Sequence, residues 1–172
     1  MATFDALQAF WPGLQVLAGD VSAAAATQEA FHSLWCGPSH HHYRSITMPL
    51  PHSHAHCLTI SRRTAYGRTR FKVHPERYDV ARSALHGSMT YYPLRPEHAE
   101  STHALYRATG SDKYLHHGAE MVASLNANAR TPVGFAAIKS VVDMKLEDHT
   151  PSFFLAETLK VRMCLRVCVG RG

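Results

Sequence analysis

An arginine and two glutamates lie within six residues of this 172-residue chain, at Arg95, Glu97 and Glu100. Pro96 stands where a helix would begin, because proline is favoured at the first helical position. Glu97 and Glu100 are three residues apart, so they would share one face of the first turn. Such a group could handle protons, bind a metal ion or hold a polar ligand. Acids in a first turn also complement the helix dipole, and from spacing alone this structural interpretation is favoured.

Helical patterns flank this motif and must position it. Residues 4–35 carry apolar side chains at helical spacing, although Pro12-Gly13 is expected to break or kink the segment. Gly19 is a candidate C-cap and Asp20 a candidate N-cap between two helices. The motif itself predicts a helix that continues to about Thr109.

A second helix is expected after Gly110-Ser111-Asp112, and the short turn predicts an antiparallel helical hairpin. Its expected buried face consists of Tyr114, Leu115, Ala119, Met121, Val122 and Leu125. Residues 131–138 fit a turn or a short strand, and residues 152–160 begin another helix with Ser152 as candidate N-cap. Helix pairs with short β excursions between them predict an all-α fold of packed hairpins, such as a partial α/α toroid.

Residues 36–72 differ in kind from the rest. They hold six of the 14 histidines, three prolines and six Lys/Arg, with no Asp or Glu, which predicts a His/Arg-rich loop or a disordered insertion. The net charge of +5 belongs to this segment, since +5 minus 6 leaves −1 for the remainder. Nucleic-acid binding is not favoured, because it would require basic residues on an ordered element.

The composition sets further limits. A hydrophobic fraction of 45% is ordinary for a soluble globular protein. The apolar stretches are far shorter than the ~20 residues of a membrane span, and the first residues do not resemble a signal peptide. The four cysteines have neither zinc-site spacing nor a disulfide pattern, so they leave the redox compartment open.

Five ordered blocks of the sequence resemble glycoside hydrolase family 47, the class I α-1,2-mannosidases. They are F-D-A-L-Q-A-F-W-P-G-L-Q-V-L-A-G-D at 4–20, P-E-R-Y at 75–78, Y-P-L-R-P-E-H-A-E-S-T at 92–102, G-F-A-A-I-K at 134–139 and S-F-F-L-A-E-T-L-K at 152–160. The sequence of these blocks is most similar to that of the ER degradation-enhancing α-mannosidase-like branch. The resemblance covers roughly residues 4–35 and 73–160.

This resemblance implies a fold, a reaction and a location. The fold would be an α/α toroid whose hairpins surround an acidic pocket. The reaction would be hydrolysis of α-1,2-linked mannose from the high-mannose N-glycans of misfolded glycoproteins, with inversion and with the help of a calcium ion, in the endoplasmic reticulum. An inverting glycosidase needs an acid and a base about 6.5–9.5 Å apart.

The resemblance also assigns roles to individual residues. Glu97 matches the family's catalytic base, Glu76 its proton donor, and Asp5 a third active-site acid. Three further residues, Arg95, Glu100 and Glu157, match residues that line the sugar and calcium pocket, while no metal ligand is assigned in this chain. Glu157 fits a solvated mid-helix residue equally well.

The chain also departs from the family pattern. The N-terminal third of the usual catalytic domain and the threonine segment that binds calcium are absent. Residues 1–35 and 73–160 are therefore expected to form a partial catalytic domain, 36–72 an aberrant insertion and 161–172 an atypical tail. The alternatives are a lectin-like toroid with little turnover or an inactive fragment. A weaker one is a metal-binding module made by the histidines of residues 40–42 and 52–56.

Overall fold

The computed structural model describes residues 3–36, 71–161 and 164. The loop or disorder predicted for residues 36–72 and the atypical tail predicted for 161–172 lie almost entirely outside the described residues, as do the histidines of residues 40–56. The proposed division of the chain therefore stays a prediction. No helix in the described part is long and apolar enough to cross a membrane.

The N-terminal segment folds into a short strand and a helical hairpin. Strand β1 (Thr3–Asp5) leads into a 3-10 helix, η1 (Ala6–Phe10), then into α1 (Trp11–Leu17) and α2 (Val21–Cys36). Pro12 does not break a helix. It lies in the first turn of α1, where the helix changes from 3-10 to α. The predicted N-cap is confirmed, since Asp20 Oδ1 accepts a hydrogen bond of 3.1 Å from the Ala23 amide. The predicted C-cap is one residue off: Ala18 is the C-cap of α1, and Gly19 follows it with φ 87°.

The second hairpin consists of α4 (Glu97–Thr109) and α5 (Asp112–Asn128). Helix α4 begins one residue later than expected, with Pro96 as its N-cap, and ends at Gly110 in the left-handed conformation. The predicted buried face of α5 is wrong in part. Leu115, Ala119 and Val122 are only partly buried. The buried residues are Tyr114, His117, Gly118, Met121, Ser124 and Leu125.

Short β elements join the hairpins. Strand β2 (Arg77–Asp79) lies between β1 and β3 (Ala84–Leu85) in an antiparallel sheet, with Phe4 opposite Tyr78. Strands β4 (Arg130–Thr131) and β5 (Gly134–Phe135) form a hairpin after α5, as predicted for residues 131–138. The last helix, η2 (Phe154–Leu159), is a π-helix. Ser152 does not cap it, because Phe153 occupies the N-cap position without a side-chain hydrogen bond.

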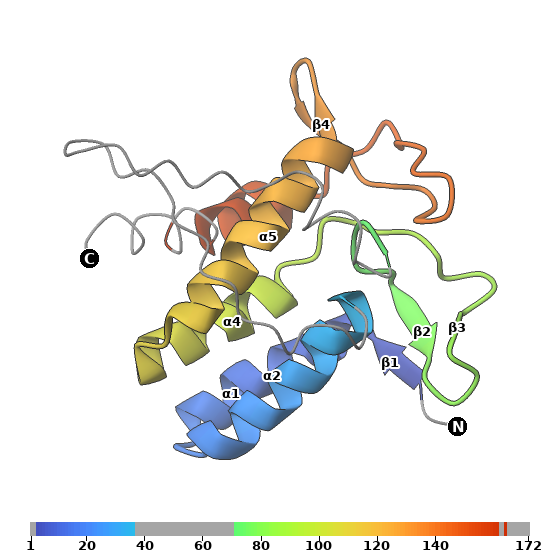
Figure 1. Cartoon of the computed structure of the whole chain (residues 1–172). Coiled ribbons are helices and arrows are strands. Elements are labelled where there is room, and N and C mark those ends of the chain that lie inside the picture. Colours follow the sequence, from blue (N-terminus) through green and yellow to red (C-terminus); the bar gives the residue numbers. More distant parts are fainter. Residues whose placement is uncertain (1–2, 37–70, 162–163, 165–172) are drawn as a thin grey trace, which may run out of the picture.

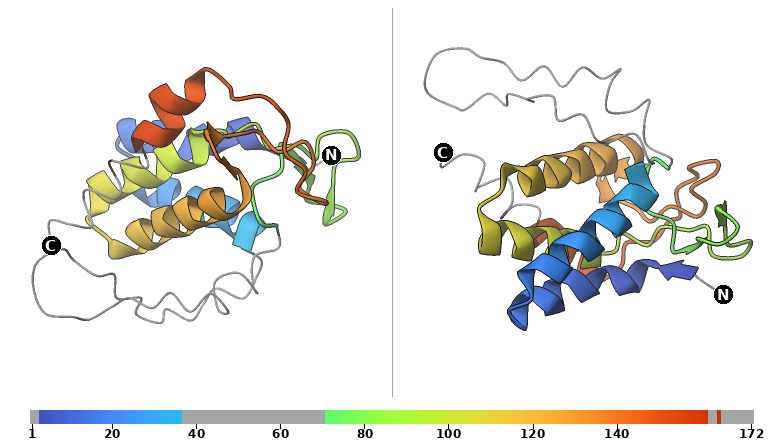
Figure 2. Two further views of the ribbon diagram at one scale, coloured as in Figure 1. Left: turned by 90° about the horizontal axis from the view of Figure 1, so that it is seen from above. Right: turned by 60° about the horizontal axis from the view of Figure 1, so that its bottom comes forward.

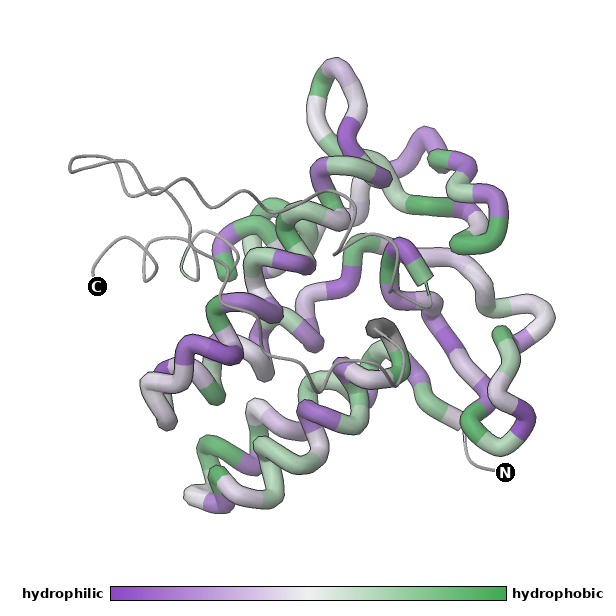
Figure 3. Tube along the Cα trace, viewed as in Figure 1, coloured by the Kyte–Doolittle hydropathy of each residue, from purple (hydrophilic) through white to green (hydrophobic). Residues whose placement is uncertain are grey.

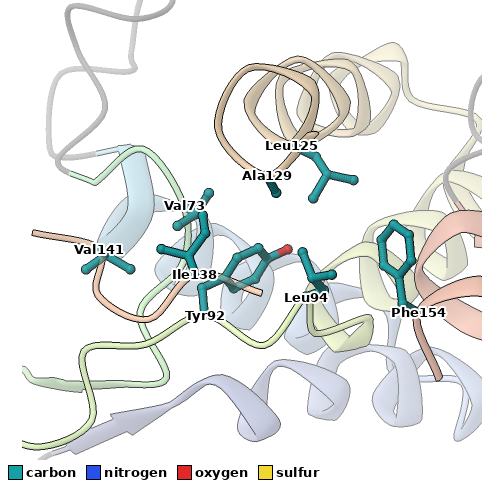
Figure 4. Packing of buried hydrophobic residues seen from close by; sticks show 8 residues of the cluster. All are labelled: Val73, Tyr92, Leu94, Leu125, Ala129, Ile138, Val141 and Phe154. Carbon is teal, nitrogen blue, oxygen red and sulfur yellow. The ribbon is translucent and has the colours of Figure 1, made fainter. Parts of the chain in front are cut away.

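The two hairpins lie side by side (Figures 1 and 2), with α4 in contact with α1, α2 and α5. Leu125 of α5 and Ala129, its C-cap, face Tyr92, Leu94 and Phe154 (Figure 4). Tyr92 and Leu94 come from the segment before α4, and Phe154 comes from η2. The full cluster consists of Val73, Tyr92, Leu94, Leu125, Ala129, Ile138, Val141 and Phe154. This apolar cluster fixes the segment that carries Arg95.

A polar contact fixes α1 against α4. The fully buried Ser101 donates a hydrogen bond of 2.5 Å to the Ala9 carbonyl and accepts one of 3.0 Å from the Gly13 amide. A Cβ atom at position 13 would lie 3.2 Å from Ser101 Oγ. Glycine therefore permits the close approach of the two helices.

Candidate active site

Arg95 follows a residue with an unusual backbone. Leu94 is fully buried and has φ 62°, which is uncommon for a residue with a Cβ atom. Its carbonyl accepts a hydrogen bond of 2.7 Å from the buried Thr158 hydroxyl in η2. The apolar cluster and this bond together hold the strained residue. They direct the chain so that Arg95 reaches Glu76.

The Arg95 guanidinium binds the Glu76 carboxylate with two hydrogen bonds. Nε donates to Oε2 at 3.0 Å and Nη2 to Oε1 at 2.5 Å, the paired geometry that guanidinium and carboxylate groups favour. The Glu76 side chain is only 3% exposed. The hydrogen bonds to Glu76 raise the pKa of Arg95 above its usual value, and the negative charge of Glu76 adds to this effect. Burial acts in the opposite direction. Glu76 is thus an anchored anion.

Glu97 has a different environment. Burial raises the pKa of its carboxyl group, and the charges of Glu100 and Glu76 raise it further, whereas its own backbone and Arg95 act in the opposite direction. One of its oxygens, Oε2, is buried and has no hydrogen-bond partner among the described residues. Glu97 is therefore a half-buried acid with a raised pKa and with one carboxylate oxygen that no described residue binds.

Glu100 and Glu157 extend this acidic group. Burial raises the pKa of Glu100, and the charge of Glu157 adds to the effect. Glu157 is exposed on η2 and interacts with Glu100 only through its charge. Four predicted site residues are thus electrostatically coupled around Arg95: Glu76, Glu97, Glu100 and Glu157.

Asp5 lies at the end of β1 and has two structural partners. Its Oδ2 accepts hydrogen bonds of 3.2 and 2.7 Å from Nε and Nη2 of Arg77. Its Oδ1 accepts one of 3.1 Å from the Leu7 amide, and Gln8 completes a capping box for η1. The Ala6 amide donates to the Glu76 carbonyl at 2.8 Å, so the Asp5 turn is attached to the segment that carries Glu76.

Sequence reasoning missed the residues that position these acids. Arg77 stood inside the P-E-R-Y block and could have been found as a basic neighbour of Glu76. Leu94 and Thr158 gave no signal, because neither a positive φ at leucine nor a hydrogen bond from a π-helix has a sequence pattern.

The described residues contain no cluster of metal-ligating side chains. In residues 3–36, 71–161 and 164, no three or more His, Cys, Asp or Glu side chains are arranged to hold a metal ion. The acidic group around Arg95 can bind and release protons, and it can accept hydrogen bonds from hydroxyl groups. That is the chemistry of glycoside hydrolysis, which uses a pair of carboxyl groups.

The fold resembles that of a solved carbohydrate hydrolase. The α-1,2-mannosidase from Trichoderma reesei superposes with a TM-score of 0.62 over 95% of this chain and 33% of its own length, at 19% sequence identity. The prediction of an all-α fold, part of an α/α toroid of helical hairpins, is thereby confirmed.

The family follows from the sequence match. Residues 1–161 match the model of glycosyl hydrolase family 47, and the chain belongs to this family. It is 43% identical over 154 residues to alpha-mannosidase I MNS5 of Arabidopsis thaliana. It is 38% identical over 156 residues to human ER degradation-enhancing alpha-mannosidase-like protein 3. These matches cover 90% and 91% of this chain but only 21% and 13% of the two relatives.

Proposed function

We propose that this chain serves in the hydrolysis of α-1,2-linked mannose from N-glycans. The observation that supports the proposal is the state of Glu97, half-buried, with a raised pKa and with one carboxylate oxygen that lacks a partner among the described residues. A proton acceptor in a glycosidase needs both properties, because it must approach a water molecule and take up its proton. Membership of the family and the names of the relatives agree with this reaction.

The proposed reaction is a single displacement with inversion. Glu97 accepts a proton from water while the water oxygen forms a bond to the anomeric carbon. The bond between that carbon and the glycosidic oxygen breaks on the opposite side, and the leaving oxygen takes a proton from an acid. If Glu76 is that acid, it must first take up a proton and leave Arg95. Asp5 would likewise have to leave Arg77, so either acid needs a rearrangement before it can donate.

Arg95, Glu100 and Glu157 are proposed to contact the sugar. Carboxylates accept hydrogen bonds from hydroxyl groups, and a guanidinium donates them. Calcium assistance is part of the proposal only with ligands from outside the described residues, and no step is assigned to the ion. The proposed setting is the trimming of high-mannose glycans on misfolded glycoproteins in the endoplasmic reticulum, which follows from the names of the ER degradation-enhancing relatives.

The substitution Glu97→Gln separates this function from its alternatives. We expect it to reduce mannose release from a high-mannose glycan by at least ~100-fold, because general-base catalysis contributes about 10²–10⁴-fold. Glycan binding, measured by calorimetry, should persist. If the unsubstituted chain binds the glycan but releases no mannose, the lectin-like alternative is favoured. If the unsubstituted chain neither binds the glycan nor releases mannose, the inactive fragment is favoured.

A further inference from the structure

Four histidines that the proposed reaction does not use lie together between three helices. His32 comes from α2, His98 from α4, His117 from α5, and His74 from the segment before β2. The rings of His32 and His117 are stacked with centroids 3.5 Å apart. His32 and His98 are also stacked at 5.6 Å, and His74 lies 4.9 Å from His98. The four rings thus form one continuous group.

Polar contacts link two of these rings, those of His98 and His32, to Gln28 and Glu120. Gln28 Nε2 donates to Thr102 Oγ1 at 2.7 Å, and the same NH2 group lies 3.3 Å from His98 Nδ1. The NH2 group also lies 3.4 Å from the His98 carbonyl. An NH2 group beside Nδ1 suits the His98 tautomer that carries its hydrogen on Nε2. His98 Nε2 lies 3.3 Å from His32 Nδ1, and His32 Nε2 lies 3.5 Å from Glu120 Oε2. These polar contacts run from Gln28 through His98 and His32 to Glu120.

Few negative charges face this group. Glu120 on α5 is next to His32. On α2, Glu29 is exposed and pairs with Lys113 at 3.0 Å. From the other elements the neighbours are the Tyr114 ring on α5 and the Phe4 ring on β1. Arg95 and Glu97 lie on either side of Pro96, and Arg95 lines a cavity of about 30 Å³ together with His74 and His98.

Within the described part of the chain, these rings are not arranged as a metal site. Among the described residues, no three or more of the possible metal-ligating side chains have the arrangement that a metal ion needs. Stacked imidazoles present their faces, and not their lone pairs, to one another. The group is instead a set of proton acceptors in a buried interface, with one carboxylate nearby to balance a first positive charge.

We propose that the four histidines act as an acid-sensitive lock that holds α2 against α4 and α5 while they are neutral and opens when they are protonated. A second proton on His98 would place a donor where the Gln28 amide group donates. A cationic His32 and a cationic His98 would direct two N–H groups at each other. Further protons would also repel one another across the stacked rings, because those distances are too short for screening by solvent.

The direction of the pH effect follows from His74. Burial, together with the charge of His32, lowers the pKa of His74 to about 3. The unfolded chain takes up this proton near pH 6.5 and the folded chain does not. Stability from this histidine is therefore complete above pH 6.5 and is lost as the pH falls from about 6.5 toward about 3. Between pH 7.5 and 5.0, His74 alone lowers the folding equilibrium constant by ~30-fold.

Urea unfolding at pH 7.5 and 5.0 tests the lock, because few carboxylates change their charge between these values. His74 should lower the wild-type equilibrium constant by ~30-fold, and the raised pKa values of Glu97 and Glu100 offset part of this fall. The variant His74→Phe keeps a ring of similar shape and should lose most of that sensitivity, whereas the control His149→Gln, at an exposed position, should keep it. The raised pKa values of Glu97 and Glu100 act equally in all three proteins.

Nitrogen-15 NMR of the histidine rings gives a second result that does not depend on a variant. We expect His98 to carry its hydrogen on Nε2 at pH 7.5, and His74 to remain neutral at pH 5.0. An unchanged pH sensitivity in His74→Phe, or titration of His74 near pH 6.5 in the folded chain, would overturn the proposal.

Discussion

Within the acidic group, Arg95 forms an ion pair with a glutamate, whereas Glu97 is a partly buried carboxyl group. Arg95 holds Glu76 in a two-point ion pair, whereas Glu97 is half-buried and its Oε2 has no hydrogen-bond partner among the described residues. An ionised, poorly solvated carboxylate destabilises the fold. Glu97 thus combines a cost in stability with the reactivity that the proposed function requires.

This cost gives a prediction for the stability of Glu97→Gln. A pKa that is raised by folding means that the folded chain retains its proton longer, so stability is lost as the pH rises through the folded pKa. The neutral amide should therefore be more stable than wild type at pH 7, by on the order of 0.5 kcal/mol because the side chain is partly exposed. Urea unfolding at pH 7 and pH 4 measures the difference, which should shrink at pH 4.

The exposed Glu147 supplies the control for this experiment. Glu147→Gln should change stability by less than about 0.5 kcal/mol at either pH. A loss of stability in Glu97→Gln at pH 7 would mean that the carboxylate accepts hydrogen bonds that the described residues do not supply.

At the scale of the elements, η2 supports the segment that carries Arg95. Thr158 is fully buried, and its hydroxyl bonds the carbonyl of Leu94, the residue with a positive φ. Thr158→Val keeps the shape but leaves that carbonyl without its donor. We expect a loss of about 1–3 kcal/mol in the free energy of unfolding, the cost of an unsatisfied buried group. Thermal and urea unfolding measure it.

The conservative variant Thr158→Ser provides the comparison. It retains the hydroxyl and removes one methyl group, so its loss should be near 1 kcal/mol. Equal losses in the two variants would show that packing, and not the hydrogen bond to Leu94, is what Thr158 contributes.

Elements with local signals were predictable from the sequence. Gly19, Asp20 and Gly110 marked helix ends because caps depend on one or two residues. The phase of α5 was predicted less well, because His117 and Ser124 are polar but buried. His117 packs on another histidine, and Ser124 bonds the Lys72 carbonyl, contacts that only the tertiary structure supplies. The π-helix has no pattern of its own in the sequence.

The candidate site was predictable only as a set of residues. The ordered blocks indicated Asp5, Glu76, Glu97 and Arg95. The roles of these residues depend, however, on which acid forms an ion pair with which arginine. The pairs Arg95–Glu76 and Arg77–Asp5 join segments 19 and 72 residues apart in the chain. Spacing within a block cannot reveal partners at that separation.

At the scale of the whole molecule, one face of η1 and α1 is apolar and exposed. Apolar segments recur along this hairpin (Figure 3), and the side chains of Leu7, Phe10, Trp11 and Leu14 are each 44–48% exposed at helical spacing. Trp11 is part of this face. An exposed stripe of this kind promotes association.

We therefore expect Leu14→Lys to reduce self-association without loss of stability. The free energy of unfolding should change by less than about 0.5 kcal/mol, because the side chain is partly exposed. Sedimentation velocity at several concentrations measures the association. Val133→Lys is the matched control, since Val133 is 98% exposed at the β4–β5 turn and apart from the stripe. An equal effect of both substitutions would attribute the change to net charge.

The proposed role of Glu97 is that of the base in an inverting hydrolysis of α-1,2-linked mannose. The most direct measurement is proton NMR of an α-1,2-linked mannobiose incubated with the chain, which identifies the first anomer of mannose released. We expect the β-anomer first from the wild-type chain, with release from Glu97→Gln at least ~100-fold slower. Three results would contradict this role of Glu97: no release of mannose by the wild-type chain, the α-anomer as the first product, or undiminished release by Glu97→Gln.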